Sequence, residues 1–219
     1  ESSGMKRYLK GLKPNSIDDI AVMVSLYRPG PMELIPEYIN RKHGRSPIEY
    51  LHPLLEPVLE ETYGIMIYQE QLIKAVQVLA GFTLAEADVL RKAVGKKIKK
   101  LLDQQEDKFK FGCKNNGISD YVARKFWALV EPFNRYGFNK SHAVCYAMIG
   151  YQTAYLKANY PTQFMVAELN SCKDIERIKE VVAELKSMGI SVLPPSINYS
   201  QARFGGIGKE IRFGLSAIK

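Results

Sequence analysis

Cysteine is scarce in this sequence of 219 residues, and its spacing excludes two common frameworks. Cys113, Cys145 and Cys172 are odd in number and far apart, and no Cys-x-x-Cys pair occurs. A disulfide scaffold and a zinc site both need cysteines at closer, paired spacings. We therefore expect three buried, reduced cysteines, as in a cytosolic protein.

Long apolar runs are also missing. No stretch approaches the roughly 20 apolar residues that a membrane-spanning helix needs. No secretory signal precedes the first helical segment. We expect no membrane partner and a cytoplasmic location.

The sequence lacks carboxylates that could converge on metal ions. Two-metal phosphoryl transfer needs acids around ions about 4 Å apart, and an Asp-x-Asp pair on a strand places two on one face. No such pair occurs. Glu86 and Asp88 come nearest, but on a helix they point about 200° apart. We expect no catalytic residue, no metal site and no cofactor within this chain.

Positive charge is plentiful. The formal net charge is +8, which favours an anionic partner such as nucleic acid, a nucleotide or a membrane surface. An apolar share of 46% and a charged share of 25% are typical of a globular protein. The length suffices for one large domain or two small ones. The sequence starts with Glu1 rather than Met, so we expect a piece of a longer protein.

The pattern of apolar residues predicts a mainly α chain. Helix start and stop signals bound these segments: residues 5–12, 16–27, 33–43, 54–62, 69–79, 83–94, 97–114, 120–133, 141–160, 162–169 and 174–188. Residues 65–68 form a short extended run. From residue 190 the composition changes, and a strand at 191–193 precedes a hairpin formed by 203–204 and 211–213. We expect a helical domain over 1–170 and a small α/β tail over 171–219.

The helix predicted after residue 140 is the centre of the first domain. Small residues recur along it at spacings of four, three, four and four, which would let another helix approach closely: Ala143, Ala147, Gly150, Ala154 and Ala158. Ser141 can cap its first turn. With Lys140 and His142 alongside, the positive end of this helix would attract an anion.

Residues 91–100 hold six basic residues and no acid. This run is either a solvated basic face or a phosphate site. On a helix, Arg91 and Lys92 project about 100° apart and could hold different oxygens of one triphosphate. A bend at Gly95 would bring Lys96 and Lys97 back beside Arg91.

Three other features allow a structural and a functional interpretation. The Arg28-Pro29-Gly30-Pro31 turn either ends a helix or also directs Arg28 into a site. Gln69 opens a helix, where it could cap or hydrogen-bond a base or sugar. His142 is a structural hydrogen-bonding residue, a phosphate contact, or half of a nucleophilic pair with Cys145.

Four blocks carry a resemblance to a known family. In order they read SLYRPGPMELIPEYINRKHG, YGIMIYQEQ, ADVLRKAVGKK and GFNKSHAVCYAMIGYQTAYLKANYP. Together they resemble the fingers region of bacterial replicative DNA polymerases of the C family. The resemblance covers essentially the whole chain and implies a multi-helix fingers domain with a small α/β tail.

The resemblance implies a DNA-directed DNA polymerase as the parent protein. Its partners would be template-primer DNA, deoxynucleoside triphosphates, the palm and thumb domains of the same chain, and a sliding clamp reached through segments outside this one. The catalytic aspartates and Mg²⁺ would belong to a palm domain upstream, so the isolated chain would be inactive. Lys92 stands where many members have Arg, which changes the geometry of a phosphate contact.

The resemblance and the residue patterns together select the nucleotide- and phosphate-binding candidates. They are Arg28, Gly30, Gln69, Arg91, Lys92, Lys96, Lys97, Asn139, Lys140, Ser141 and His142. The alternative is a non-enzymatic basic helical module that holds nucleic acid by its backbone. An independent phosphotransferase is disfavoured, because the sequence lacks both a metal-binding dyad and a Walker-type loop.

Overall fold

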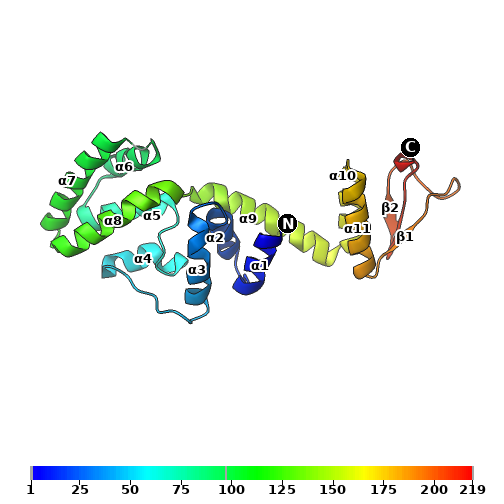
Figure 1. Cartoon of the computed structure of the whole chain (residues 1–219), viewed down its shortest axis with the longest axis horizontal. Helices are drawn as coiled ribbons and strands as arrows, with labels where there is room; N and C mark the ends of the chain where they lie inside the picture. The colour runs from blue at the N-terminus through cyan, green and yellow to red at the C-terminus, as the bar shows by residue number, and fades with distance from the viewer. Residues whose placement is uncertain (1, 97, 219) are drawn as a thin grey trace. The chain divides into compact units, whose positions relative to one another are not determined.

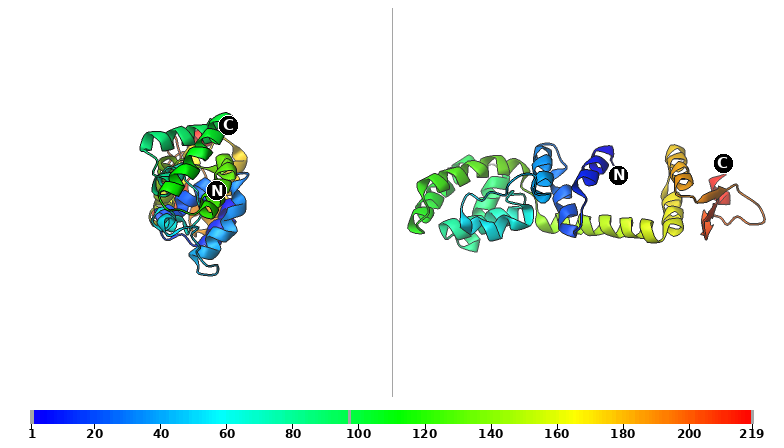
Figure 2. Two further views of the ribbon diagram at one scale, coloured as in Figure 1. Left: turned by 90° about the vertical axis from the view of Figure 1, so that its left-hand side faces the viewer. Right: turned by 90° about the horizontal axis from the view of Figure 1, so that it is seen from below.

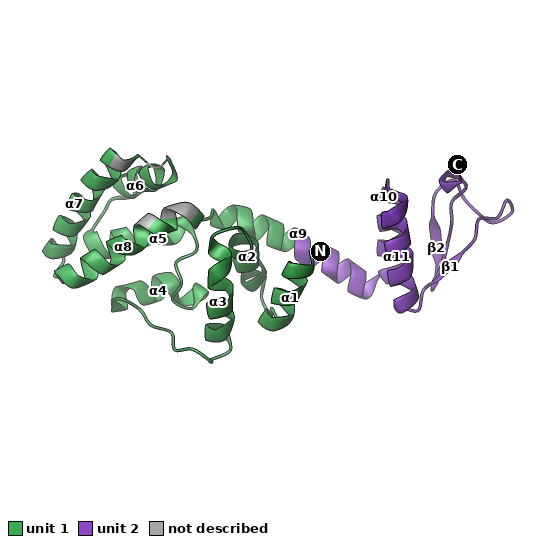
Figure 3. Cartoon of the chain, in the orientation of Figure 1, with its two compact units in different colours: residues 1–148 green, residues 149–219 purple. Residues whose placement is uncertain are grey.

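The computed structural model describes residues 2–96 and 98–218 (Figure 1). These residues form eleven α-helices, several 3₁₀ turns and one three-stranded sheet, which confirms the mainly α fold with a short hairpin. None of the helices in the described part is long and apolar enough to cross a membrane. The chain divides into two compact units, residues 1–148 and 149–219 (Figure 3). The division lies inside a helix, whereas the change in composition that suggested a boundary after residue 170 lies within the second unit.

The first unit begins with three short helices. They are α1 (Ser3–Leu12), α2 (Ile17–Leu26) and α3 (Ile35–Lys42), with the 3₁₀ turn η1 (Pro31–Leu34) before the last. The Ser16 side chain caps α2 by accepting a hydrogen bond from the Asp19 N–H. The helix expected from residue 33 begins instead as a 3₁₀ turn after Gly30, because two prolines flank that glycine.

The segment predicted as one helix over residues 54–62 consists of three short pieces. They are η2 (Pro53–Leu55), α4 (Glu56–Leu59) and η3 (Glu60–Thr62). Tyr63 and Gly64, both with positive φ, then reverse the chain. Of the extended run that follows, Tyr68 pairs with Phe138 in an isolated parallel bridge.

Four longer helices enclose an aromatic core. They are α5 (Gln69–Ala80), α6 (Leu84–Lys96), α7 (Lys99–Asn115) and α8 (Asp120–Tyr136). Figures 1 and 2 show α6, α7 and α8 beside one another, and α5 contacts both α6 and α7. Phe109 is fully buried at the centre and stacks on Phe126 with 5.3 Å between ring centroids. This core fixes the base from which α6 presents its basic residues.

The long helix α9 (Lys140–Asn159) is buried only at its beginning within the part of the chain described. Ala143 and Ala147 are fully buried in a core shared with α2 and α3. Gly150, Ala154 and Ala158 are exposed. The predicted central, closely packed helix is therefore wrong for its second half. A row of small residues allows another helix to approach closely, but it does not ensure that such a helix is present.

The second unit places two helices against a small sheet. They are α10 (Pro161–Ser171) and α11 (Ile175–Ser187), beside β1 (Ser191–Leu193), β2 (Gly205–Ile207) and β3 (Glu210–Arg212), and the turn η4 (Leu215–Ala217) follows. β3 is central, parallel to β1 and antiparallel to β2. The hairpin is confirmed, but its first strand lies on the glycines. A Cβ at Gly206 would come within 2.8 Å of Thr162, so α10 packs closely on this strand.

Of the three cysteines predicted to be buried, only Cys113 is buried in the structure. All three cysteines are free thiols. Cys113 is fully buried, and this burial raises its pKa to about 11. Cys145 is exposed and Cys172 is half-buried. The scarcity of cysteine therefore excluded a disulfide framework but could not place the side chains.

Candidate functional site

The start of α9 lies against the start of α5, and backbone hydrogen bonds join them. Phe138 N–H donates to the Ile67 carbonyl at 3.1 Å, and Gln69 N–H donates to the Phe138 carbonyl at 2.8 Å. These bonds bring together candidates from two blocks about 70 residues apart in the chain. Gln69 stands on one side, and Asn139 to His142 stand on the other.

The capping residue of α9 is Asn139, and the prediction of Ser141 was wrong. Asn139 Oδ1 accepts the His142 N–H at 2.8 Å, which is the usual geometry of an asparagine N-cap. The helix begins at Lys140, so Ser141 already belongs to its first turn and is exposed. Asn139 and Ser141 are both good capping residues, and the contacts described next select the earlier one.

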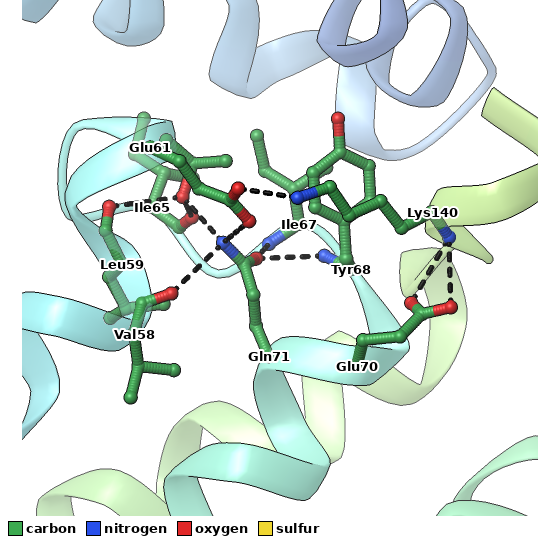
Figure 4. A network of polar contacts seen from close by, with 10 residues as sticks. Val58, Leu59, Glu61, Ile65, Ile67, Tyr68, Glu70, Gln71 and Lys140 are labelled. Atoms are coloured by element: carbon green, nitrogen blue, oxygen red, sulfur yellow. Dashed lines mark hydrogen bonds and ion pairs between the residues drawn. The ribbon is translucent and has the colours of Figure 1, made fainter. Parts of the chain in front are cut away.

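An internal carboxylate occupies the positive end of α9. The backbone N–H of Lys140 donates to both oxygens of Glu70, at 3.2 and 3.0 Å (Figure 4). The side-chain amide of Asn139 donates to the same carboxylate at 3.1 Å. A carboxylate is favourable here because of the partial charge at the helix N-terminus. The anion site predicted from the sequence is thus already filled by Glu70.

The side chain of Lys140 has a second acidic partner. Its Nζ lies 2.5 Å from Glu61 Oε2, and 5.7 Å from the centroid of the Tyr68 ring. Glu61 stands on η3, so the ion pair joins that turn to α9 (Figure 4). Sequence reasoning missed Glu61 because the two partners lie 79 residues apart.

A buried amide holds this part of the site together. Gln71 Oε1 accepts the N–H groups of Ile67 and Tyr68, at 2.8 and 2.9 Å. Its Nε2 donates to Thr62 Oγ1 at 2.8 Å and lies 3.5 Å from Glu61 Oε1. Gln71 therefore satisfies the backbone before α5 and anchors η3 at once (Figure 4). Glutamine at the third position of a helix is the sequence signal of such a capping box.

Arg28 points at the same junction. Its Nη2 donates to the Tyr136 carbonyl at 2.6 Å, its Nε donates to Ser25 O at 2.8 Å, and its guanidinium lies 4.3 Å from the Phe138 ring centroid. Burial lowers its pKa. Gly30 has a φ of +104°, a conformation that favours glycine. The turn therefore does direct Arg28, which hydrogen-bonds the backbone before α9.

Gln69, like Arg28, donates a hydrogen bond to the backbone that precedes α9. Its Nε2 donates to the Gly137 carbonyl at 3.3 Å. Arg28 and Gln69, both predicted from the sequence as nucleotide-binding candidates, thus contact residues 136–138. Beyond them, the exposed His142 ring lies 5.4 Å from Phe138 and 4.8 Å from Tyr146, centroid to centroid.

Part of the positive charge of residues 91–100 is neutralised. This corrects the expectation, based on the absence of acids within that run, that no acid pairs with it. Asp88 lies 2.8 Å from Arg91 Nη2 and 2.8 Å from Lys92 Nζ. These hydrogen bonds, from Lys92 and then Arg91, lower the pKa of Asp88. The acid stands just before the run, so counting charge over residues 91–100 missed it.

The bend predicted at Gly95 is also wrong. α6 continues through Gly95 and ends at Lys96, so the helix does not turn Lys96 back toward Arg91 there. Lys97 lies outside the described residues. Gly95 costs helix stability but does not end a helix by itself.

Comparison with known proteins decides the family. Residues 1–117 match the family described as the bacterial DNA polymerase III alpha subunit finger domain. The chain belongs to this family. It is 49% identical to a DNA polymerase III subunit alpha of Chlamydia pneumoniae over 100% of the chain and 18% of that protein.

Two further relatives are covered to a similar extent. A DNA polymerase III subunit alpha of Aquifex aeolicus is 49% identical over 100% of the chain and 19% of its own length. One of Rickettsia felis is 52% identical over 93% of the chain and 17% of its own length. The chain therefore spans about a fifth of the curated relatives that it matches. The family expected from the four sequence blocks is confirmed.

Proposed function

We propose that this chain is the portion of a bacterial replicative DNA polymerase that binds the incoming deoxynucleoside triphosphate and template-primer DNA. The observation that carries the proposal is identity of 49% to a DNA polymerase III subunit alpha over 100% of the chain. A net charge of +8 suits both polyanionic ligands. The parent protein would be a DNA-directed DNA polymerase acting in replication.

The reaction of the parent protein is templated nucleotidyl transfer. The primer 3′-hydroxyl attacks the α-phosphate of the nucleotide, and pyrophosphate leaves. Here Arg91, Lys92, Lys140 and His142 would neutralise the phosphate charge that develops. Arg28 and Gln69 would shape the nucleotide pocket indirectly, because they hold the backbone just before α9.

Magnesium does not fit the donors found in the described part of the chain. Among the described residues, no group of three or more histidine, cysteine, aspartate or glutamate side chains comes together around a metal site. Two-metal catalysis needs such a group. We propose that Mg²⁺ and the catalytic aspartates belong to the palm domain of the parent protein.

The remaining partners follow from the same proposal. The palm and thumb domains of the parent chain would complete the active site, and segments outside this chain would reach the sliding clamp. The polymerase would work in the cytoplasm, where the bacterial chromosome lies.

Photocrosslinking tests the proposal. The full-length protein is assembled on a primer-template ended by a dideoxynucleotide, with a complementary nucleotide that carries a photoreactive group on its γ-phosphate. We expect crosslinks within residues 1–219, and excess unlabelled complementary nucleotide should suppress them. A backbone-binding module would be crosslinked elsewhere or without dependence on complementarity, and that result would refute the proposal.

A further inference from the structure

Lys140 meets two acids at different atoms. Glu70 accepts hydrogen bonds from its backbone N–H, and Glu61 pairs with its side-chain ammonium (Figure 4). Lys140, one of the proposed phosphate-binding residues, is therefore held at both its backbone and its side chain. The Glu70 contact is part-buried and the Glu61 contact is exposed, so the two would respond differently to a bound phosphate.

The Glu70 contact belongs to the frame of the site. It lies at the first N–H of α9, and it also binds the amide of Asn139, whose Oδ1 then accepts from His142. Glu70 itself stands in the first turn of α5, which the buried Gln71 network anchors. Removing its charge would loosen the capping turn from which Lys140 and His142 project.

The Glu61 contact is of another kind. The two side chains are 33% and 37% exposed. An ion pair in such a half-solvated position contributes little to stability and breaks readily. A triphosphate offers several charged acceptors, whose hydrogen bonds to an ammonium are stronger than neutral ones. It would therefore displace Glu61 from Lys140 without unfolding anything.

We propose that the two acids have different roles because they contact different parts of Lys140. Glu70 is a positioning residue that sets the direction of Lys140 through the backbone. Glu61 holds the ammonium in the free protein and competes with the nucleotide phosphates for it. The inference rests on the proposed function, because it takes the nucleotide's phosphates as the competing anion.

The two acids should therefore have opposite effects when neutralised. The measurement is the Kd of a complementary deoxynucleoside triphosphate for the full-length protein on a dideoxy-terminated primer-template. E61Q should lower this Kd about threefold or more, and E70Q should raise it about threefold or more. E60Q is the matched control, since it removes the same charge one residue earlier without touching the Lys140 pair.

Repeating the substitutions in a protein that lacks the Lys140 ammonium shows whether the effect depends on that side chain. In a protein that carries Lys140→Ala, E61Q should no longer tighten nucleotide binding, because the ammonium for which it competes is gone. E70Q should also speed amide hydrogen exchange at residues 140–143, whereas E61Q should not. The Kd of the primer-template should stay within about twofold in every variant, which separates these effects from misfolding.

Several outcomes would overturn the inference. They are an E61Q protein that behaves like E60Q, tightening that persists without Lys140, and an E70Q protein with unchanged nucleotide affinity. Failure of the proposed function is distinguishable, because then the wild-type complex itself would not prefer the complementary nucleotide.

Discussion

Lys42 and Asp19 form a buried ion pair, with 2.5 Å between Lys42 Nζ and Asp19 Oδ2. The side chains are only 7% and 3% exposed. The carboxylate also accepts hydrogen bonds from the Asn15 N–H at 3.0 Å and the Tyr38 hydroxyl at 3.3 Å. This cluster ties α2 to α3, and with them the turn that directs Arg28.

Breaking this pair should destabilise the chain strongly. Lys42→Met leaves the Asp19 carboxylate buried without its cation, which costs about 3–5 kcal/mol. Urea unfolding at pH 7 measures the loss. Lys10→Met, at an exposed position of α1, is the control and should change the free energy of unfolding by less than about 0.5 kcal/mol. Similar stabilities for the two variants would show that the pair is dispensable.

The same pair predicts a pH dependence. Burial alone would raise the pKa of Asp19, but the Lys42 hydrogen bond and charge, with the bonds from Asn15 and Tyr38, outweigh it and lower the pKa. A lowered folded-state pKa stabilises the chain above the ordinary aspartate value of about 3.9. That stability is lost as the pH falls through the folded-state pKa.

Denaturation at a series of pH values checks the sign. Between pH 5 and pH 2, wild-type stability should fall more steeply than that of Asp19→Asn, which cannot titrate at this position. Parallel curves would mean that Asp19 has an ordinary pKa in the folded chain.

Two glutamines should respond oppositely to the same substitution. Gln71→Leu removes the acceptor of two buried N–H groups, Ile67 and Tyr68, and should cost about 2 kcal/mol or more. Gln105 has a buried Oε1 without a hydrogen-bond partner among the described atoms. Gln105→Leu should therefore be neutral or stabilising in thermal unfolding. Equal losses in both variants would contradict the network around Gln71.

Alanine at two helical glycines, Gly95 on α6 and Gly112 on α7, should have opposite effects on stability. A Cβ at Gly95 meets nothing within 4 Å, and the helix is continuous there, so Gly95→Ala should stabilise by about 0.5–1 kcal/mol. A Cβ at Gly112 would lie 2.2 Å from the Ala80 carbonyl oxygen, so Gly112→Ala should destabilise by about 1–3 kcal/mol. A destabilised Gly95→Ala variant would revive the bend expected from the sequence.

Much of the fold follows from local signals. Ser16 as a cap and Gly81 as a left-handed helix end are both visible in the sequence and present in the structure. These features depend on a few neighbouring residues, so the sequence contains them. The burial of α9 was not predictable in this way, because small residues show only that a neighbour is allowed.

Individual residues of the candidate site could be predicted from the sequence, but the contacts between them could not. Lys140 and Gln69 were identified from their local setting, but Glu61 lies 79 residues from its lysine. Asp88 was one turn from Arg91 and was missed because the count began after it. Which side chains pair across the fold depends on tertiary packing, and such pairs produce no periodic pattern in the sequence.

Arg91 and Lys140 are proposed to bind the phosphates of one nucleotide, and the nucleotide Kd of Arg91→Ala and Lys140→Ala tests this. In the full-length protein on a dideoxy-terminated primer-template, each variant should raise the Kd of the complementary nucleotide at least about tenfold, as for lost charge-assisted hydrogen bonds. Each should leave the Kd of the primer-template within about twofold, and Lys10→Ala should change neither. An unchanged nucleotide Kd with weakened DNA binding in both variants would contradict the account and favour a basic surface that holds the DNA backbone.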